Sequence, residues 1–370
     1  MIESLSSLPL EQKIGQLFFI GIAGPQADDA TREFLSQISP GGVCLFARNI
    51  KETAQTRNLL DEIRALLPVT PFLSVDQEGG FVDRLRRVMT PMPAPSKLAN
   101  VQDAQRQAKI IGETLRILGF NMDFAPVVDV IDDERAKHTN GLFSRTFGRS
   151  KLDAAKFGAE FLNALQTNGV IGCLKHFPGL GAARVDSHEE LPVVEIQESD
   201  LSETDLFPYR ELLGIGNVHA VMAAHASFPN HRLQETDQNG KLLPSSLSYN
   251  FITKLLRGEL GFRGLVITDD LEMGAILKNY GIGEACKMAV LAGVDMLAIC
   301  ADGEAVRTGY NAVLDAVNNG EIGLERINES LSRISKSKSY LSEPLTFDQN
   351  RLRELSKHIS ELNDRLSCNS

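Results

Sequence analysis

Short apolar runs typical of buried strands recur eight times along this 370-residue chain, and stretches with helical spacing of apolar residues separate them. The expected strands lie near residues 15–23, 42–46, 71–75, 120–128, 170–174, 219–224, 264–268 and 295–299. Helical spacing is clearest in residues 52–67, 103–118, 152–168 and 284–292. Strands that alternate with helices favour a parallel sheet, and eight strands close a (β/α)8 barrel. We therefore predict an α/β protein built as a (β/α)8 TIM barrel.

A doubly wound open sheet is the alternative architecture for the same alternation. Such a sheet binds dinucleotides at a Gly-x-Gly-x-x-Gly turn after its first strand, and the sequence has no such turn there. Polar residues follow four of the expected strands, namely Asp76, Lys175, His225 and Asp269. In barrel enzymes the active site lies at the carboxyl ends of the strands, so these positions favour the barrel.

The composition changes after about residue 325. Residues 345–370 are charged and contain five apolar residues at a spacing of three and four: Leu352, Leu355, Ile359, Leu362 and Leu366. This pattern predicts an amphipathic helix with a narrow apolar seam. We expect it to dock on the outer helices of the barrel, with a dimer contact as the alternative. The predicted organisation is one catalytic domain over residues 1–335 and a helical extension over residues 336–370, in a monomer or a weak dimer.

Charge and hydropathy argue against several classes of protein. The formal net charge is −10 and there is no basic cluster, so we expect no nucleic-acid partner and no binding to anionic membranes. No apolar run approaches the roughly 18 residues of a membrane span. Residues 1–7 lack the basic and apolar parts of a secretory signal. These observations predict a cytoplasmic protein.

The sequence shows no pattern that would bind a metal or a cofactor. Residues 188–190 read His-Glu-Glu, which is not the His-Glu-x-x-His of a zinc site, and the other histidines have no ligand spacing. The five cysteines form neither a metal-ligand pattern nor a disulfide framework. A glycine-rich phosphate loop is also missing from the sequence. We predict neither metal nor cofactor.

Residues 175–188 read Lys-His-Phe-Pro-Gly-Leu-Gly-Ala-Ala-Arg-Val-Asp-Ser-His and say most about function. The apolar run before them is expected to deliver Lys175 and His176 at its C-terminal end. The proline and glycines that follow turn the chain into a loop with Asp186 and His188. A carboxylate two residues from a histidine can fix the tautomer and orientation of the ring, as general acid–base catalysis requires. This composition indicates an active site.

The segment resembles the signature of family 3 glycoside hydrolases of the β-N-acetylglucosaminidase branch, Lys-His-Phe-Pro-Gly-His-Gly-x4-Asp-Ser-His. Four other blocks agree with the family in order: residues 41–50 (Gly-Gly-Val to Arg-Asn-Ile), 76–80 (Asp-Gln-Glu-Gly-Gly), 123–130 (Asp-Phe-Ala-Pro-Val-Val-Asp-Val) and 268–273 (Thr-Asp-Asp-Leu-Glu-Met). The resemblance spans about residues 8–335. Leu180 stands where the family has histidine, and Phe81 where an arginine usually follows Glu-Gly-Gly.

The resemblance implies a retaining, exo-acting β-N-acetylglucosaminidase with a covalent glycosyl intermediate on Asp269. It also implies that His188 is the acid–base residue and that Asp186 orients it. Histidine suits this role because its ordinary pKa is near 6.5. Five residues match the family's substrate-binding positions: Asp76, Arg84, Arg145, Lys175 and His176. Glu78 is expected to have a structural role beside them.

The implied substrates are N-acetylglucosaminides, such as N-acetylglucosaminyl-anhydromuramyl peptides from cell-wall recycling. Because a histidine acid–base does not repel an anion, a β-N-acetylglucosaminide phosphorylase or another β-glycosidase of the family is a second hypothesis. A third is a sugar-binding protein that has lost catalysis, supported only by Leu180 and Phe81.

Several residues near these motifs have more than one interpretation. Asp270 fits a cap of the following helix better than catalysis. Substrate-assisted catalysis would instead use Asp269 and Asp270 as a polarising and acid pair. Asp129, His225 and Met273 are expected either to line the pocket or to pack in the core.

Overall fold

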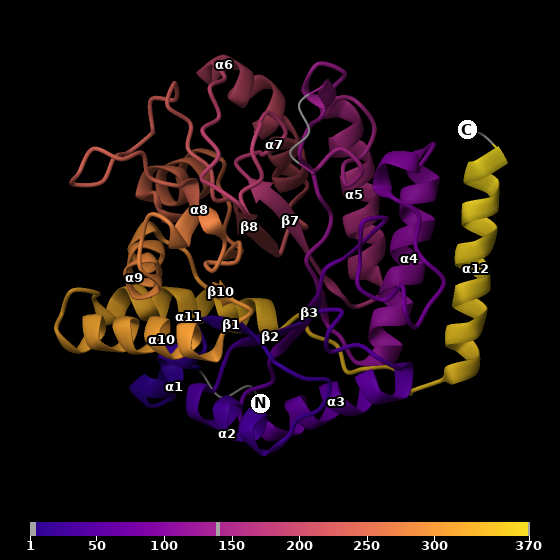
Figure 1. Cartoon of the computed structure of the whole chain (residues 1–370), viewed down its shortest axis with the longest axis horizontal. Coiled ribbons are helices and arrows are strands. Elements are labelled where there is room, and N and C mark those ends of the chain that lie inside the picture. The colour runs from indigo at the N-terminus through magenta and orange to yellow at the C-terminus, as the bar shows by residue number, and fades with distance from the viewer. Residues whose placement is uncertain (1–4, 138–140, 369–370) are drawn as a thin grey trace.

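The computed structural model describes residues 5–137 and 141–368 and is built around a closed parallel barrel (Figure 1). The strands pair in the order β10-β1-β2-β3-β6-β7-β8-β9. Hydrogen bonds close the ring between the last and first strands of this order, from Thr268 N–H to Met296 O and from Met296 N–H to Val266 O, each 3.0 Å. The barrel strands are β1 (Phe18–Gly21), β2 (Gly42–Leu45), β3 (Phe72–Val75), β6 (Met122–Asp123), β7 (Ile171–Phe177), β8 (Ala220–Ala223), β9 (Leu265–Thr268) and β10 (Leu297–Ile299).

Helices cover the outside of the barrel (Figure 1). The connections between strands contain α2 (Asp29–Ile38), α3 (Thr53–Leu66), α4 (Val101–Leu118), α5 (Lys151–Thr167), α6 (Glu198–Asp200), α7 (Leu206–Ile215), the π-helix η6 (Asn250–Glu259), α8 (Gly274–Leu277) and α9 (Ile282–Ala292). Helix α1 (Leu10–Gly15) precedes β1, and α10 (Gly303–Asn318), α11 (Leu324–Lys338) and α12 (Gln349–Cys368) follow β10. Shorter helical turns are η1 (Leu5–Ser7), η2 (Pro95–Lys97), η3 (Arg135–Lys137), η4 (Leu201–Asp205) and η5 (Ser245–Leu247). The predicted (β/α)8 barrel is confirmed, and the open sheet is excluded.

Local sequence explains where these elements begin and end. Asn100 accepts a hydrogen bond from Asp103 N–H (3.0 Å) and caps the start of α4, and Gly119, with φ of 100°, ends it. Ser150 caps α5 in the same way. Strands β2, β3, β8 and β9 are buried along their whole length. Strands of a parallel barrel are covered on both faces, so they appear in sequence as continuous apolar runs.

Two elements differ from the expectation. Strand β6 covers only Met122–Asp123 of the predicted 120–128, because Pro126 lacks the N–H that a strand ladder needs. Strand β7 continues to Phe177, with a register shift against β8 after Leu174, so Lys175 and His176 lie within the strand instead of after it. A short hairpin of β4 (Gln77–Gly79) and β5 (Val82–Asp83) follows β3.

Helix α12 lies along α4 at the edge of the molecule (Figure 1). Its seam residues Leu352, Leu355, Ile359, Leu362 and Leu366 are all buried. Arg351 Nε lies 2.6 Å from Glu113 Oε1 of α4, and Ser356 Oγ accepts a hydrogen bond from Thr90 N–H (3.3 Å). The division at residue 335 stays a prediction, and α11 runs across it. Within the described residues, no helix combines the length and hydropathy that a membrane span requires.

Candidate active site

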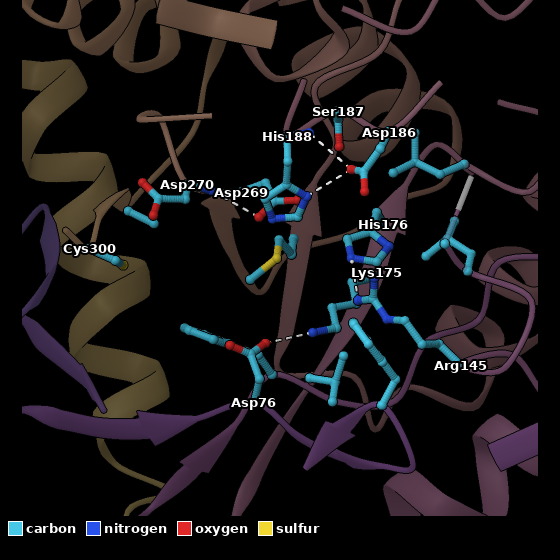
Figure 2. A pocket seen from close by; sticks show the side chains of 18 of the residues that line it. Asp76, Arg145, Lys175, His176, Asp186, Ser187, His188, Asp269, Asp270 and Cys300 are labelled. Carbon is cyan, nitrogen blue, oxygen red and sulfur yellow. Dashed lines mark hydrogen bonds and ion pairs between the residues drawn. The ribbon is translucent and has the colours of Figure 1, made fainter. Parts of the chain in front are cut away.

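A cavity of about 250 Å³ lies at the carboxyl ends of the barrel strands. Its lining includes the eight residues that the resemblance assigns to catalysis or substrate binding: Asp76, Arg84, Arg145, Lys175, His176, Asp186, His188 and Asp269. Figure 2 shows most of these side chains around the cavity. They come from the two residues that flank the β4–β5 hairpin, the segment before α5, strand β7 and its following loop, and the residue after β9. The fold therefore gathers residues that are up to about 190 positions apart.

Two cations, the buried Lys175 and the half-buried Arg145, share the carboxylate of Glu78 in the wall of this cavity. Lys175 Nζ lies 2.6 Å from Glu78 Oε1 and 2.7 Å from Asp76 Oδ1. Arg145 Nε donates to Glu78 Oε2 at 2.8 Å. Burial opposes ionisation of Glu78, but Arg145 and Lys175 outweigh it and lower its pKa to about 2. The two carboxylates balance the two cations, so these charges can be buried together.

His176 is oriented by a carboxylate behind it. Its Nδ1 lies 2.7 Å from Asp129 Oδ2, and Asp129 is buried. The other oxygen of Asp129 accepts a hydrogen bond from Leu180 N–H at 2.7 Å. With Nδ1 bound to Asp129, Nε2 lies beside Arg145, 3.4 Å from its Nη2. Residue 180 contributes to this arrangement through its backbone, so the leucine side chain does not disturb it.

Asp269 follows β9 directly, and its backbone N–H donates to Ala223 O at 2.9 Å. Burial opposes ionisation of its side chain, but His176, His225 and the N–H of Asp270 outweigh burial, and the pKa falls below the ordinary 3.8. The neighbouring Asp270 also lines the cavity, and burial raises its pKa to about 7. At neutral pH Asp269 is therefore ionised, whereas Asp270 is close to half protonated, so the two adjacent carboxyl groups have different tendencies to hold a proton.

Asp270 caps no helix. Its Oδ1 accepts a hydrogen bond from Glu272 N–H at 3.0 Å and so stabilises a turn. Helix α8 begins later, at Gly274, with Met273 at its N-cap position. The prediction of a helix cap is therefore wrong, because two further residues of irregular chain separate Asp270 from that position.

His188 and Asp186 form a hydrogen-bonded pair on the loop after β7. His188 Nδ1 lies 2.8 Å from Asp186 Oδ1, which also accepts from His188 N–H at 3.0 Å. Burial opposes ionisation of Asp186, but these hydrogen bonds and the charge of His188 lower its pKa. The His188 side chain is 70% exposed. The start of α8 holds the backbone of this loop, since Gly274 N–H donates to His188 O at 3.1 Å.

Other predicted residues pack behind the cavity wall. His225 is fully buried, with Nδ1 2.7 Å from Ser246 Oγ and Nε2 3.1 Å from Asp270 O. It therefore positions the backbone of Asp270. Met273 is also buried. Asp123 is a residue that the sequence analysis did not single out: its Oδ1 accepts from Gln77 N–H at 2.9 Å and anchors the hairpin. Its place within the Asp-Phe-Ala-Pro block was the only signal.

Residues 9–337 match the family described as "Glycosyl hydrolase family 3 N terminal domain". The chain belongs to glycoside hydrolase family 3. Within the described parts of this family 3 chain, no cluster of three or more His, Cys, Asp or Glu side chains could hold a metal ion.

Two curated relatives carry the name β-hexosaminidase. The β-hexosaminidase A of Pseudoalteromonas piscicida is 32% identical over 332 residues, which is 84% of this chain and 55% of the relative. This family 3 chain thus spans about half the length of that relative. The β-hexosaminidase of Nitrosomonas eutropha is 34% identical over 293 residues, or 76% of this chain and 80% of the relative.

Solved family 3 structures are also similar. The family 3 β-N-acetylglucosaminidase from Paenibacillus sp. str. FPU-7 superposes with a TM-score of 0.87 at 37% identity, covering 96% of this chain and 69% of its own. A family 3 glycosyl hydrolase from Mycobacterium smegmatis gives a TM-score of 0.80 at 32% identity, covering 90% of this chain and 98% of its own.

Proposed function

We propose that this family 3 protein is a retaining, exo-acting β-N-acetylglucosaminidase that hydrolyses terminal β-linked N-acetylglucosamine. One observation carries the proposal: an ionised, half-buried carboxylate, Asp269, shares a cavity with the hydrogen-bonded pair of His188 and Asp186. Retaining hydrolysis needs a nucleophile below the anomeric carbon and an acid–base group beside the leaving oxygen. The names of the relatives support the choice of sugar.

In the first step the Asp269 carboxylate attacks the anomeric carbon while the bond to the leaving oxygen breaks. The proton on His188 Nε2 passes to that oxygen, so the leaving group departs as an alcohol. The low pKa of Asp269 keeps it ionised for the attack. Asp186 accepts the Nδ1–H of His188 and stabilises the imidazolium before transfer.

In the second step water attacks the glycosyl–Asp269 ester from the side of the departed group. Neutral His188 takes a proton from this water at Nε2, and Asp269 leaves as a carboxylate. Two displacements at one carbon restore the β configuration. His188 ends the cycle protonated, ready for the next substrate.

The remaining polar residues would hold the sugar. Asp76 offers a charged acceptor to sugar hydroxyls, and such bonds are stronger than neutral ones. Lys175, His176 and Arg145 stand beside it, fixed by Glu78 and Asp129. Arg84 Nη2 lies 4.0 Å from Asp76 Oδ2, and its buried Nε has no partner within the described residues. Arg84 also lines the cavity, where its guanidinium can face a substrate oxygen.

Cleavage of para-nitrophenyl β-N-acetylglucosaminide tests the activity, and a sugar-binding protein without catalysis would release no nitrophenol. Asp269→Ala should abolish turnover, and added azide should restore part of the rate and yield the α-glycosyl azide. A β-azide product, or near wild-type activity, would remove Asp269 from the nucleophilic role. Substrate-assisted catalysis would give tight binding of a thiazoline analogue and no covalent adduct with a fluorinated sugar.

A phosphorylase is the second candidate, because a neutral histidine base next to exposed solvent would admit phosphate as the acceptor. The exposed position of His188 favours this. Faster turnover in phosphate buffer, with N-acetylglucosamine phosphate as product, would identify it. As natural substrates we propose cell-wall muropeptides, on the resemblance of the motifs, and turnover of N-acetylglucosaminyl-anhydromuramyl peptides tests this.

A further inference from the structure

Phe81 is the most exposed large apolar side chain among the described residues, and it lines the active-site cavity. Its relative exposure is 78%. A second exposed apolar residue, Val185, lines the same cavity from the loop that carries His188. Single exposed apolar residues are ordinary, but two that line one cavity beside its charged side chains indicate a surface that binds a ligand.

The backbone under Phe81 is rigid. Residues 80 and 81 form the two-residue turn between β4 and β5, since Gly79 pairs with Val82. Gly79 and Gly80 have φ of 98° and 62°, which favours glycine. Gly80 N–H donates to Met92 O at 2.9 Å, and a Cβ on Gly80 would lie 2.5 Å from Ala94 Cβ. The phenyl ring therefore extends from a fixed hairpin, and binding against it requires little ordering of the backbone.

The same hairpin reaches the charged wall of the cavity at its base. Asp76 immediately precedes β4, and Glu78, within β4, binds Lys175. A sugar held at Asp76 therefore lies toward the base of the hairpin, with Phe81 at the tip. The acid His188 must stand beside the leaving oxygen. Because Val185 lies on the loop that carries His188, the leaving group departs toward the entrance that Val185 and Phe81 line.

We propose that Phe81 is a platform for the leaving group, which is a pyranose ring whose apolar face stacks on the phenyl ring. This rests on the proposed glycosidase function and deepens it by assigning a residue that binds the leaving group. One face of a β-linked pyranose consists of C–H groups, since its hydroxyls lie around the edge of the ring. A flat aromatic ring matches that face, whereas it offers no hydrogen bond or charge to a small polar group.

The test compares two substrates that differ in the leaving group. N,N′-diacetylchitobiose loses a pyranose, and trifluoroethyl β-N-acetylglucosaminide loses an alcohol of similar acidity without a ring. For Phe81→Ala we expect the ratio of kcat/KM for chitobiose to that for the trifluoroethyl glycoside to fall about three- to tenfold. The fall should come mainly from a higher KM for chitobiose. Phe81→Trp should restore the ratio, and Phe81→Leu should give an intermediate value.

Ile215→Ala is the matched control, because Ile215 is 67% exposed and lies in α7, away from the cavity lining. It should leave the ratio unchanged. A parallel experiment uses N-acetylglucosaminyl-anhydromuramic acid in place of chitobiose. A lower ratio of kcat/KM values for Phe81→Ala with either disaccharide supports the proposal, and the disaccharide that shows it identifies which pyranose binds to Phe81. An unchanged ratio with both disaccharides overturns the proposal. An error in the proposed glycosidase function would look different from an unchanged ratio, because the wild-type protein would then cleave none of these glycosides.

Discussion

Replacing Glu78 by glutamine tests whether Lys175 and Arg145 depend on one buried carboxylate. The substitution keeps the size of the side chain and removes its charge. Lys175, only 2% exposed, would retain Asp76 as its counterion, and Arg145 would lose its ion-pair partner in the described residues. We expect loss of stability together with weaker substrate binding, because both cations line the cavity.

The magnitude follows from the pKa of Glu78. The pKa falls from the ordinary 4.5 to about 2 on folding, and each pKa unit corresponds to about 1.4 kcal/mol. The charged carboxylate therefore contributes about 3 kcal/mol at pH 7, close to the cost of removing one partner of a buried ion pair. Since the folded pKa is the lower one, this contribution is complete above pH 4.5 and is lost as the pH falls through about 2.

Urea unfolding at pH 7 and pH 3 measures this contribution. The difference in unfolding free energy between wild type and Glu78→Gln should shrink from about 3 kcal/mol to about 1 kcal/mol between those pH values. Glu361→Gln is the control, because its ion pair with Arg106 is exposed and should contribute less than about 1 kcal/mol. The reasoning fails if Glu78→Gln costs no more than the control, or if its cost does not change with pH.

Two further predictions concern the proposed acid–base residue and a buried lysine. His188→Ala should slow the hydrolysis of glycosides with poor leaving groups by about 10²-fold or more. It should spare the glycosylation step with activated phenyl glycosides, and Asp186→Ala should show a smaller effect in the same direction. Equal losses on both substrate types, measured by steady-state kinetics, would return the acid role to a nearby carboxylate. Lys338 is buried, with Nζ 2.8 Å from Gln16 Oε1 and over the ring of Phe72, and burial lowers its pKa from 10.5 to about 7. Unfolded chains therefore bind this proton more tightly, and the stability of wild type relative to Lys338→Met should rise by about 4 kcal/mol from pH 7 to pH 10.5. A pH-independent difference in urea unfolding would show that Lys338 stays charged in the folded protein.

The barrel was predictable because its strands are buried on both faces. Continuous apolar runs such as residues 71–75 and 264–268 mark such strands without any knowledge of their partners. The hairpin of β4 and β5 was not predictable, because strands of three and two residues with polar side chains show no period. Lys175 and His176 follow an apolar run in sequence, but the ladder with β8 continues to Phe177 and includes them.

The site was predictable where its contacts are local. Asp186 and His188 are two residues apart, so one loop brings their side chains together. The partner of His176 was not predictable, because Asp129 lies 47 residues away and acts through tertiary structure. The partners of His225 were not predictable either, since its position after β8 left both a pocket residue and a core residue open. Its hydrogen bonds to Ser246 and to the backbone of Asp270 direct it into the core.

The contacts of α12 with residues 89–91 can form only late in translation, after the barrel has been synthesised. Met92 binds Gly80 and Asp83 of the hairpin through its backbone, and α12 supports the residues just before it through Thr90 and Pro91. Chains fold from the N-terminus as they are synthesised, at about 5–20 residues per second. All eight barrel strands leave the ribosome before residues 349–368 do. A nascent chain can therefore close its barrel and assemble Asp269, His188 and Asp186 while the entrance still lacks its support.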